Sequence, residues 1–237
     1  MSGYTDRSRS ISAAALARVS LVLSEAGVDF RIIGGSAVMA VLRHISARQV
    51  PDYVGTLDVD VAVRNIEDRE ALCSILLQLP GATPDPDDSD RIRVPVEVDG
   101  ELVMAPVDVV TSQLAEIGPV WADIPTLPLP ALLLSKMRPY ENEGAKGKDG
   151  YDAYMLFAHA ASSPEEIART AVEVLPRELA EELLKLINVF FVMKRRAARD
   201  AAMLLRDYHG FDKKEALRKA VHLAQRFVRE LRQSLDA

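Results

Sequence analysis

Apolar and polar residues alternate with the period of a β-strand only in the first half of this chain. The alternation ends before the proline-rich segment "IPTLPLP" at 124–130, and the later residues have the three-to-four-residue apolar spacing of helices. These helices are expected at 130–139, 149–161, 164–174, 177–207 and 212–234. The sequence therefore predicts an α/β (α+β) fold, a mixed sheet flanked by helices over 1–127 and a C-terminal helical bundle over 128–237.

Within the first part, the strand and helix patterns follow one another closely. Strands are expected at 29–33, 57–63, 91–98 and 102–110, and helices at 11–26, 36–46 and 66–79. Gly27 is expected to end the first helix. Asp99-Gly100 stands between the last two strands and predicts a tight hairpin.

Composition narrows the class of protein. The chain has 237 residues, of which 49% are hydrophobic and 27% are charged, so it can bury a substantial core. Its single cysteine, Cys73, excludes an internal disulfide and fits a reducing cytosol. The polar start "MSGYTDRSRS" does not have the pattern of a signal peptide, and apolar runs such as "VFFVM" fall far below the roughly 18 residues of a membrane span. We expect a cytoplasmic protein with no membrane partner.

The charges are unevenly distributed. The net charge is −6, but the residues from Lys185 to the end include 13 Lys and Arg against 6 Asp and Glu, which is +7. Residues 1–184 therefore carry −13, from 16 basic and 29 acidic residues. A basic C-terminal surface would suit nucleic acid or an acidic partner, and a solvated helical surface accounts for it equally well.

Two aspartates, Asp58 and Asp60, stand one residue apart in the strand-like segment "LDVDVAV". Residues two apart in a strand point to the same face, roughly 7 Å apart at the backbone, while Val59 and Val61 enter the core. Two like charges so close repel each other, and a divalent cation is the usual remedy. Mg²⁺ prefers carboxylate oxygens together with phosphates and water, so this pair predicts a metal site.

A third carboxylate is expected from a neighbouring strand. Asp108 in "MAPVDVVTS" is surrounded by proline and valines, where an unpaired carboxylate would be costly. Glu97 in "VPVEVDG" is the alternative, but it stands beside the predicted turn with Asp99 and is expected to be solvated. Asp108 is therefore preferred.

The turn Gly34-Gly35-Ser36 separates the strand "DFRII" from the helix "SAVMAVLRHIS". Glycine tolerates positive φ and allows the backbone to approach a ligand closely. The N-terminus of a helix offers N–H groups and positive dipole to a phosphate, and Ser36 adds a hydroxyl donor. A phosphate-binding turn followed by a metal-binding strand is what a nucleoside triphosphate requires.

This arrangement resembles the nucleotidyltransferase superfamily with the DNA polymerase β-type palm, which has a Gly-Gly/Ser turn, an Asp-x-Asp pair and a third carboxylate on a neighbouring strand. The matching residues are Gly34, Gly35, Ser36, Asp58, Asp60 and Asp108. The spacing from Ser36 to Asp58 is longer than usual, and an extra loop in "RHISARQVPDY" would account for it.

Further along, "LLLSKMRPYENEGAKGKDGYDAYML" resembles the downstream motifs of AbiEii-type abortive-infection toxins, which have a lysine in one helix and Lys/Arg-Asp-x-x-Asp at the start of the next. Lys136, Lys148, Asp149 and Asp152 match those motifs. From the residues alone, Lys136 would reach a triphosphate as a point charge, and Asp149 with Asp152 would favour a helix start. Helix capping by Asp149 plus a surface ion pair is the alternative.

The resemblance implies a metal-dependent enzyme that moves a nucleoside monophosphate from a triphosphate such as ATP to an acceptor hydroxyl and releases pyrophosphate. Two Mg²⁺ ions would be held by Asp58, Asp60 and Asp108, with Lys136 and Asp152 also catalytic. Lys136, Lys148 and Asp149 would bind the nucleotide together with the turn Gly34-Gly35-Ser36. It further implies a toxin-like role, tRNA as acceptor and a cognate antitoxin. Two alternatives remain: a small cationic acceptor such as an aminoglycoside, and a catalytically silent module that binds a nucleotide or a partner.

Overall fold

The computed structural model describes residues 6–45, 53, 55–119, 124–142 and 144–237. Contacts divide the chain into two compact units, Met1–Ala40 with Val54–Leu127, and Val41–Tyr53 with Pro128–Ala237. Residues 46–52 of the long spacing between Ser36 and Asp58 lie outside the described residues, so the expected extra loop is not tested. No helix in the described ranges combines the length and apolar character needed to cross a bilayer.

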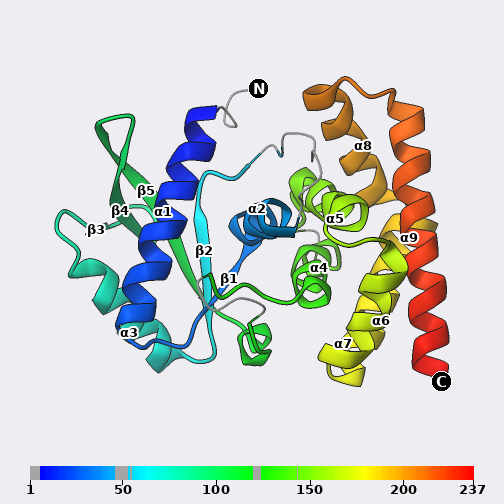
Figure 1. Cartoon of the computed structure of the whole chain (residues 1–237), viewed down its shortest axis with the longest axis horizontal. Coiled ribbons are helices and arrows are strands. Elements are labelled where there is room, and N and C mark those ends of the chain that lie inside the picture. The colour runs from blue at the N-terminus through cyan, green and yellow to red at the C-terminus, as the bar shows by residue number, and fades with distance from the viewer. Residues whose placement is uncertain (1–5, 46–52, 54, 120–123, 143) are drawn as a thin grey trace. The chain divides into compact units, whose positions relative to one another are not determined.

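The first unit contains a five-stranded mixed sheet in the order β1-β2-β5-β4-β3 (Figure 1). Its strands are β1 (Arg31–Ile33), β2 (Val59–Val63), β3 (Thr83–Pro84), β4 (Arg91–Val98) and β5 (Glu101–Thr111). Among these five strands, β2 and β5 run parallel, and the other neighbouring pairs are antiparallel. Its helices are α1 (Asp6–Glu25), the start of α2 (Gly34–Ile45), α3 (Ile66–Leu77) and the 3₁₀ turn Gln113–Glu116. The mixed sheet predicted from the sequence is confirmed.

Helices α1 and α3 pack on the sheet, where they contact β4, β5 and β2 (Figure 1). The strand residues that are buried beneath them include Val61, Val94 and Val107, all without exposed surface. Because successive strand residues point to opposite faces, Asp60 and Asp108 point to the other face. The expected burial of Val59 and Val61 is confirmed, and Asp58 lies one residue before β2 begins.

The predicted hairpin is present, with β4 and β5 joined at Asp99 and Gly100. Both residues have positive φ, 54° and 79°, which suits the two-residue turns whose twist matches that of the strands. The hairpin pairs Val98 with Glu101 and then continues one residue at a time on each strand.

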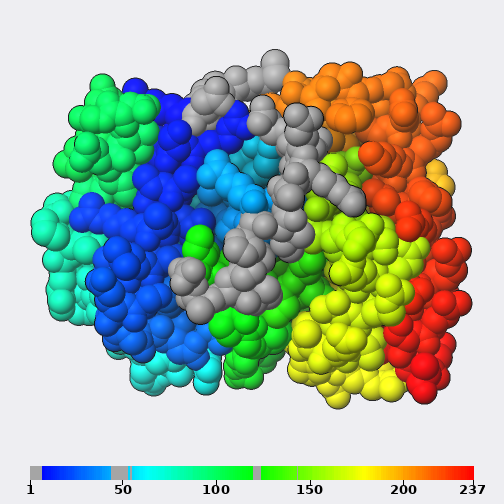
Figure 2. Space-filling model, in the orientation of Figure 1, coloured from blue at the N-terminus to red at the C-terminus, as the bar shows by residue number. Residues whose placement is uncertain are grey.

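The second unit is helical, as the sequence predicted. It contains α4 (Leu129–Met137), the 3₁₀ turn Arg138–Tyr140, α5 (Gly147–His159), α6 (Pro164–Val174), α7 (Arg177–Ile187), α8 (Arg196–His209) and α9 (Lys213–Asp236). Three phenylalanine rings, Phe157, Phe191 and Phe227, meet in its core at centroid distances of 5.7 and 5.2 Å. Helices α8 and α9 are in contact and are visible at the surface of this unit (Figure 2).

The expected single helix over 177–207 is wrong. Helix α7 ends at Ile187, the π-helical turn Asn188–Met193 follows, and α8 begins at Arg196 after Arg195 in a left-handed conformation with φ 55°. The segment contains neither glycine nor proline, so its helical pattern gives no sign of the break. The break coincides with aromatic packing, because the turn places Phe190 beside Tyr140 and Phe191 beside Phe157.

Candidate active site

Strand register brings three of the candidate residues into one row across the sheet. Asp60 of β2 pairs with Asp108 of β5, and Asp108 pairs on its other side with Arg91 of β4. Residues paired across neighbouring strands project from the same face. The row therefore places two carboxylates and one guanidinium side by side on the face opposite α1 and α3.

Asp58 joins this row from the residue that precedes β2. Carboxylate oxygens of Asp58, Asp60 and Asp108 lie within 4.8 Å of one another, and all three residues are half-buried. The Thr56 hydroxyl donates a hydrogen bond of 2.7 Å to Oδ1 of Asp58. The three aspartates proposed from the sequence thus form one cluster, and Glu97 does not join it, because it is exposed near the hairpin turn opposite Leu102.

Ser36 and Gly34 hold the cluster against the start of α2. Ser36 is fully buried, and its hydroxyl donates a 2.7 Å hydrogen bond to the backbone oxygen of Asp58. A Cβ atom on Gly34 would stand 1.7 Å from Oδ2 of Asp60, and the φ of Gly34 is +63°. Glycine is therefore required at position 34 both by the backbone and by the Asp60 carboxylate. The Ser36 hydroxyl therefore binds the Asp58 backbone. The predicted binding of a phosphate by Ser36 stays a prediction.

Arg91 contacts the cluster directly and was not predicted from the sequence. Its Nε donates to Oδ1 of Asp108 at 2.5 Å and its Nη2 donates to Oδ2 at 2.8 Å, while Nη2 lies 3.9 Å from Oδ2 of Asp58. The hydrogen bonds to Asp108 raise the pKa of Arg91 above its ordinary value, against the opposing effect of burial. A two-residue turn at Asp99-Gly100 fixes the register that pairs Arg91 with Asp108. The contact between Arg91 and Asp108 could therefore have been predicted from the turn sequence.

In the helical unit, Asp152 is fully buried between two lysines. Its Oδ2 lies 2.8 Å from Nζ of Lys136 and 3.2 Å from Nζ of Lys148, and the Tyr53 hydroxyl donates to Oδ1 at 2.7 Å. Burial by itself would raise the pKa of Asp152, but the charges of Lys136 and Lys148 outweigh it and hold that pKa below its usual range. The downstream motif therefore forms a neutralised internal cluster.

Asp149 caps the start of α5, as the alternative to a nucleotide-binding role predicted. Its carboxylate accepts a 2.9 Å hydrogen bond from the backbone N–H of Lys146, and Nζ of Lys136 lies 3.4 Å from its Oδ1. Lys148 also donates to the Tyr53 hydroxyl at 2.8 Å. Lys136, Lys148, Asp149 and Asp152 are thus brought together. The nucleotide-binding role of Lys136, Lys148 and Asp149 and the catalytic role of Lys136 and Asp152 stay predictions.

The basic residues between α7 and the first turn of α8 are exposed. Four of them, which we call the basic turn, are Lys194, Arg195, Arg196 and Arg199. Two of them lie over aromatic rings, with Lys194 Nζ 5.5 Å from the ring centroid of Phe190 and the Arg196 guanidinium 5.5 Å from that of Tyr140. Such contacts hold the alkyl chains while the charges stay in solvent.

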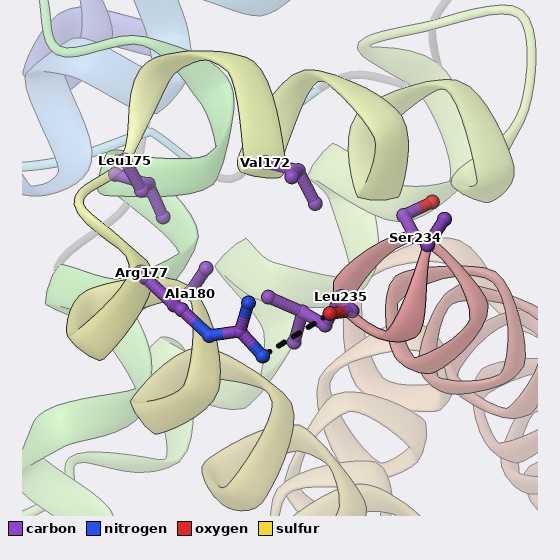
Figure 3. Close-up of a pocket in the computed structure, with 7 residues that line it drawn as sticks. Val172, Leu175, Arg177, Ala180, Ser234 and Leu235 are labelled. Carbon is purple, nitrogen blue, oxygen red and sulfur yellow. Dashed lines mark hydrogen bonds between the residues drawn. The ribbon is translucent and has the colours of Figure 1, made fainter.

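A separate small pocket lies where α6, α7 and the end of α9 meet (Figure 3). Val172, Leu175, Ala180 and Leu235 supply most of its lining, and the Arg177 guanidinium donates a 3.2 Å hydrogen bond to the Leu235 backbone oxygen. This bond joins α7 to α9. None of the predicted site residues lines this pocket.

The acidic cluster suits a hard divalent cation. It offers three carboxylates with oxygens close enough to share an ion, and oxygen ligands are those that Mg²⁺ and Mn²⁺ prefer. The absence of a side chain at Gly34 leaves the Asp60 carboxylate room beside the start of α2. The residues present therefore fit a metal of this kind.

Comparison with known proteins shows similarity in fold to solved structures. No protein-family model matches the chain, and no curated protein matches its sequence. The structure is similar to that of the JHP933 protein of Helicobacter pylori, with a TM-score of 0.59 and 12% identity over 98% of this chain and 96% of that one.

Two further solved structures are similar. A candidate nucleotidyltransferase of Helicobacter pylori has a TM-score of 0.57 and 14% identity over 94% of this chain and 96% of that one. An antigenic nucleotidyltransferase-like protein of Paracoccidioides brasiliensis has a TM-score of 0.50 and 13% identity over 89% and 93%. At these identities the likeness concerns the fold, and the chain has the fold of nucleotidyltransferase-like proteins.

Proposed function

We propose that this protein is a metal-dependent nucleotidyltransferase that moves a nucleoside monophosphate from a nucleoside triphosphate to an acceptor hydroxyl. The observation that carries the proposal is the cluster of Asp58, Asp60 and Asp108, with oxygens within 4.8 Å, beside the first turn of α2. The nucleotidyltransferase-like fold supports it. In the reaction, an oxygen of the acceptor forms a bond to the α-phosphorus and the bond from that phosphorus to pyrophosphate breaks.

Asp58, Asp60 and Asp108 would hold the divalent cations, expected to be two Mg²⁺. When bound, such cations stabilise the charge of the entering and leaving oxygens of an in-line displacement. The protein's own contribution is to fix the three carboxylates before the substrate arrives. Thr56 and Ser36 contribute to this by hydrogen bonding to the side chain and the backbone of Asp58.

The start of α2 would bind the triphosphate. Gly34 and Gly35 form its first turn directly after β1, so backbone N–H groups at this end have no partner within the helix. They and the positive helix dipole favour phosphate oxygens. Ser36, whose hydroxyl is bonded to Asp58, would contribute its backbone N–H.

The motif of the helical unit is proposed to assist nucleotide binding and catalysis. Lys136 and Lys148 are the cations that would contact phosphate oxygens, and Asp152 holds both of their ammonium groups in place. Asp149 orients the first turn of α5 through its hydrogen bond to Lys146. The resemblance to AbiEii-type toxins supports these roles.

RNA, with tRNA as the leading candidate, is the proposed acceptor. The exposed basic turn supports this choice, because polyanions bind through several Lys and Arg contacts to phosphates. The excess of acidic residues before Lys185 supports the second candidate, a small cationic acceptor such as an aminoglycoside. A toxin-like role and a cognate antitoxin stay predictions from the resemblance.

The decisive experiment incubates the protein with each of the four α-labelled triphosphates, Mg²⁺ and total RNA. Label in the tRNA fraction together with released pyrophosphate supports the proposal, and Asp60→Asn should abolish both. Transfer to an added aminoglycoside but not to RNA favours the second acceptor. Triphosphate binding without transfer to any acceptor would contradict the enzymatic proposal and favour a silent binding module.

A further inference from the structure

The row that holds Asp60 and Asp108 includes a cation of the protein itself. Arg91 is the first residue of β4 and pairs in register with Asp108, so both side chains rise from the same face. Its two nitrogen contacts, 2.5 and 2.8 Å long, engage both oxygens of Asp108 in the bidentate geometry that suits a guanidinium and a carboxylate. Arg91 therefore faces the same carboxylate that a divalent cation needs.

The geometry also sets Arg91 close to a second member of the cluster. Its Nη2 lies 3.9 Å from Oδ2 of Asp58, in addition to its contacts with Asp108. Three carboxylates whose oxygens approach within 4.8 Å repel one another strongly unless positive charge lies among them. A guanidinium provides such charge at every physiological pH, because arginine does not lose its proton in proteins.

A guanidinium and a divalent cation repel each other when they share a carboxylate. The interaction between charges a few ångströms apart near a protein surface is substantial, since the effective dielectric constant there is well below that of water. The Arg91 side chain is 32% exposed and that of Asp108 is 21% exposed, so solvent does not screen the pair fully. Full engagement of Asp108 by a cation therefore works against its bonds to Arg91.

We propose that Arg91 is a positioning residue that acts as the exchangeable counterion of the Asp58, Asp60 and Asp108 cluster: it keeps the metal-free cluster assembled and competes with the divalent cation for Asp108. This inference rests on the proposed metal-dependent function. It predicts that Arg91 lowers the affinity for the cation while it stabilises the protein in the absence of metal. The two effects have opposite signs, and a residue with a merely structural role would not produce both.

The chain offers a matched control two residues along the same strand. Arg93 projects from the same face of β4 as Arg91, but its guanidinium pairs with Asp85 at 2.8 Å. Arg93→Gln therefore removes the same charge and the same kind of ion pair without changing a contact of the three aspartates. It controls for the net charge of the protein and for the loss of an arginine from β4.

The test measures Mn²⁺ binding to the whole chain without nucleotide, by titration with free Mn²⁺ followed by electron paramagnetic resonance. Arg91→Gln should bind Mn²⁺ at least about tenfold more tightly than wild type, which corresponds to about 1.4 kcal/mol. Arg93→Gln should stay within about twofold of wild type, because its charge lies farther from the cluster. Arg91→Lys keeps the charge but loses the bidentate fork, so its affinity should lie between those of wild type and Arg91→Gln.

The second readout is the thermal unfolding midpoint, Tm, in EDTA and in saturating Mg²⁺. Arg91→Gln should have a lower Tm than wild type in EDTA and should gain more than wild type when Mg²⁺ is added. If Arg91→Gln does not fold in EDTA, Arg91→Lys supplies the same comparison. Equal or weaker Mn²⁺ binding by the folded Arg91 variants would overturn the inference and leave the proposed function standing. If neither wild type nor the variants bind Mn²⁺ without nucleotide, the inference is overturned, whereas the proposed function is tested separately by transfer from the labelled triphosphates.

Discussion

The backbone of Gly34 lies against the carboxylate of Asp60. A Cβ atom at position 34 would come 1.7 Å from Oδ2 and 2.5 Å from Cγ of Asp60, and Gly34 has the positive φ of +63°. The start of α2 therefore packs directly against the Asp60 side chain of β2, with no room for a Cβ atom at position 34. Gly34 therefore makes room for the Asp60 carboxylate of the acidic cluster. Its proposed role in phosphate binding is a separate one.

Replacement of Gly34 by alanine should displace Asp60 and destabilise the protein. Gly27→Ala is the control, because Gly27 has a similar φ of +70°, and a Cβ atom there would meet no atom of the described residues within 4 Å. Gly27→Ala should lower the free energy of unfolding by about 1–2 kcal/mol, because alanine is strained in a left-handed conformation. Gly34→Ala should cost more in urea unfolding and should also weaken Mn²⁺ binding. Equal losses in the two variants would show that the contact with Asp60 carries no energy.

The three aspartates should differ in their effect on stability without metal. Asp58→Asn and Asp60→Asn should abolish nucleotide transfer with no loss of Tm in EDTA, because each removes a charge from a repelling cluster. Asp108→Asn should also abolish transfer but should lower the free energy of unfolding by about 1 kcal/mol, since it leaves Arg91 without its bidentate partner.

Glu97→Gln is the control for this series. Glu97 lies on β4 and is exposed near the hairpin turn, so its replacement should change neither transfer nor Tm appreciably. Loss of transfer in this variant, with near-normal transfer in Asp108→Asn, would contradict the assignment of Asp108 to the cluster.

The sequence was informative where a short local pattern determines the structure. Alternation placed Asp60 and Asp108 on strands and Asp58 one residue too far into β2, which begins at Val59, and Asp99-Gly100 predicted the hairpin that pairs β4 with β5. The row itself depends on which strands are neighbours, and the parallel pairing of β2 with β5 cannot be read from either strand alone. The hairpin register already pairs Arg91 with Asp108, but only the pairing of β2 with β5 brings Asp60 beside them.

Other features depend on packing between distant segments. The break before α8 has Arg195 in a left-handed conformation, which its residue type does not favour, and it is associated with the packing of Phe190 and Phe191. The interpretation of Gly34 as a phosphate-binding glycine rested on its position before a helix, whereas its contact with Asp60 requires the folded sheet. Asp152 likewise accepts a hydrogen bond from Tyr53, which lies 99 residues away in sequence.

Asp152 should make the stability of the protein sensitive to acid. Its pKa in the folded state lies below the ordinary value of 3.8, so its contribution is fully present above that value and is lost as the pH falls through the folded pKa. Asp152→Asn leaves two buried lysines without their shared carboxylate and should lose about 3–5 kcal/mol at pH 7.

Urea unfolding of wild type and Asp152→Asn at pH 7, 5 and 3 tests this. The difference in the free energy of unfolding between wild type and Asp152→Asn should be the same at pH 7 and 5 and smaller at pH 3. Glu181→Gln removes an exposed carboxylate paired with Arg177 and should stay within about 0.5 kcal/mol of wild type at pH 7 and 5. A difference between wild type and Asp152→Asn that does not shrink at pH 3 would contradict an ionised Asp152 in the folded protein.

The basic turn should determine binding to RNA if RNA is the acceptor. Its members Lys194, Arg195, Arg196 and Arg199 are exposed and are grouped where α8 begins. Each contact between a basic side chain and a phosphate adds about one unit to the slope of log affinity against log salt. Replacing all four by glutamine should therefore weaken tRNA binding and reduce that slope by up to about four, while Mn²⁺ and triphosphate affinities stay unchanged.

A variant with the same loss of charge elsewhere separates local contacts from net charge. Lys213, Lys214, Arg218 and Lys219 are also exposed and lie in the first turns of α9. Their replacement by glutamine should alter the salt slope much less than replacement of the basic turn, because counterion release follows contacts and not total charge. Circular dichroism must show that both variants fold, since Arg196 also packs on Tyr140. Equal slopes for the two variants would make the basic turn an ordinary solvated surface and favour the small-molecule acceptor.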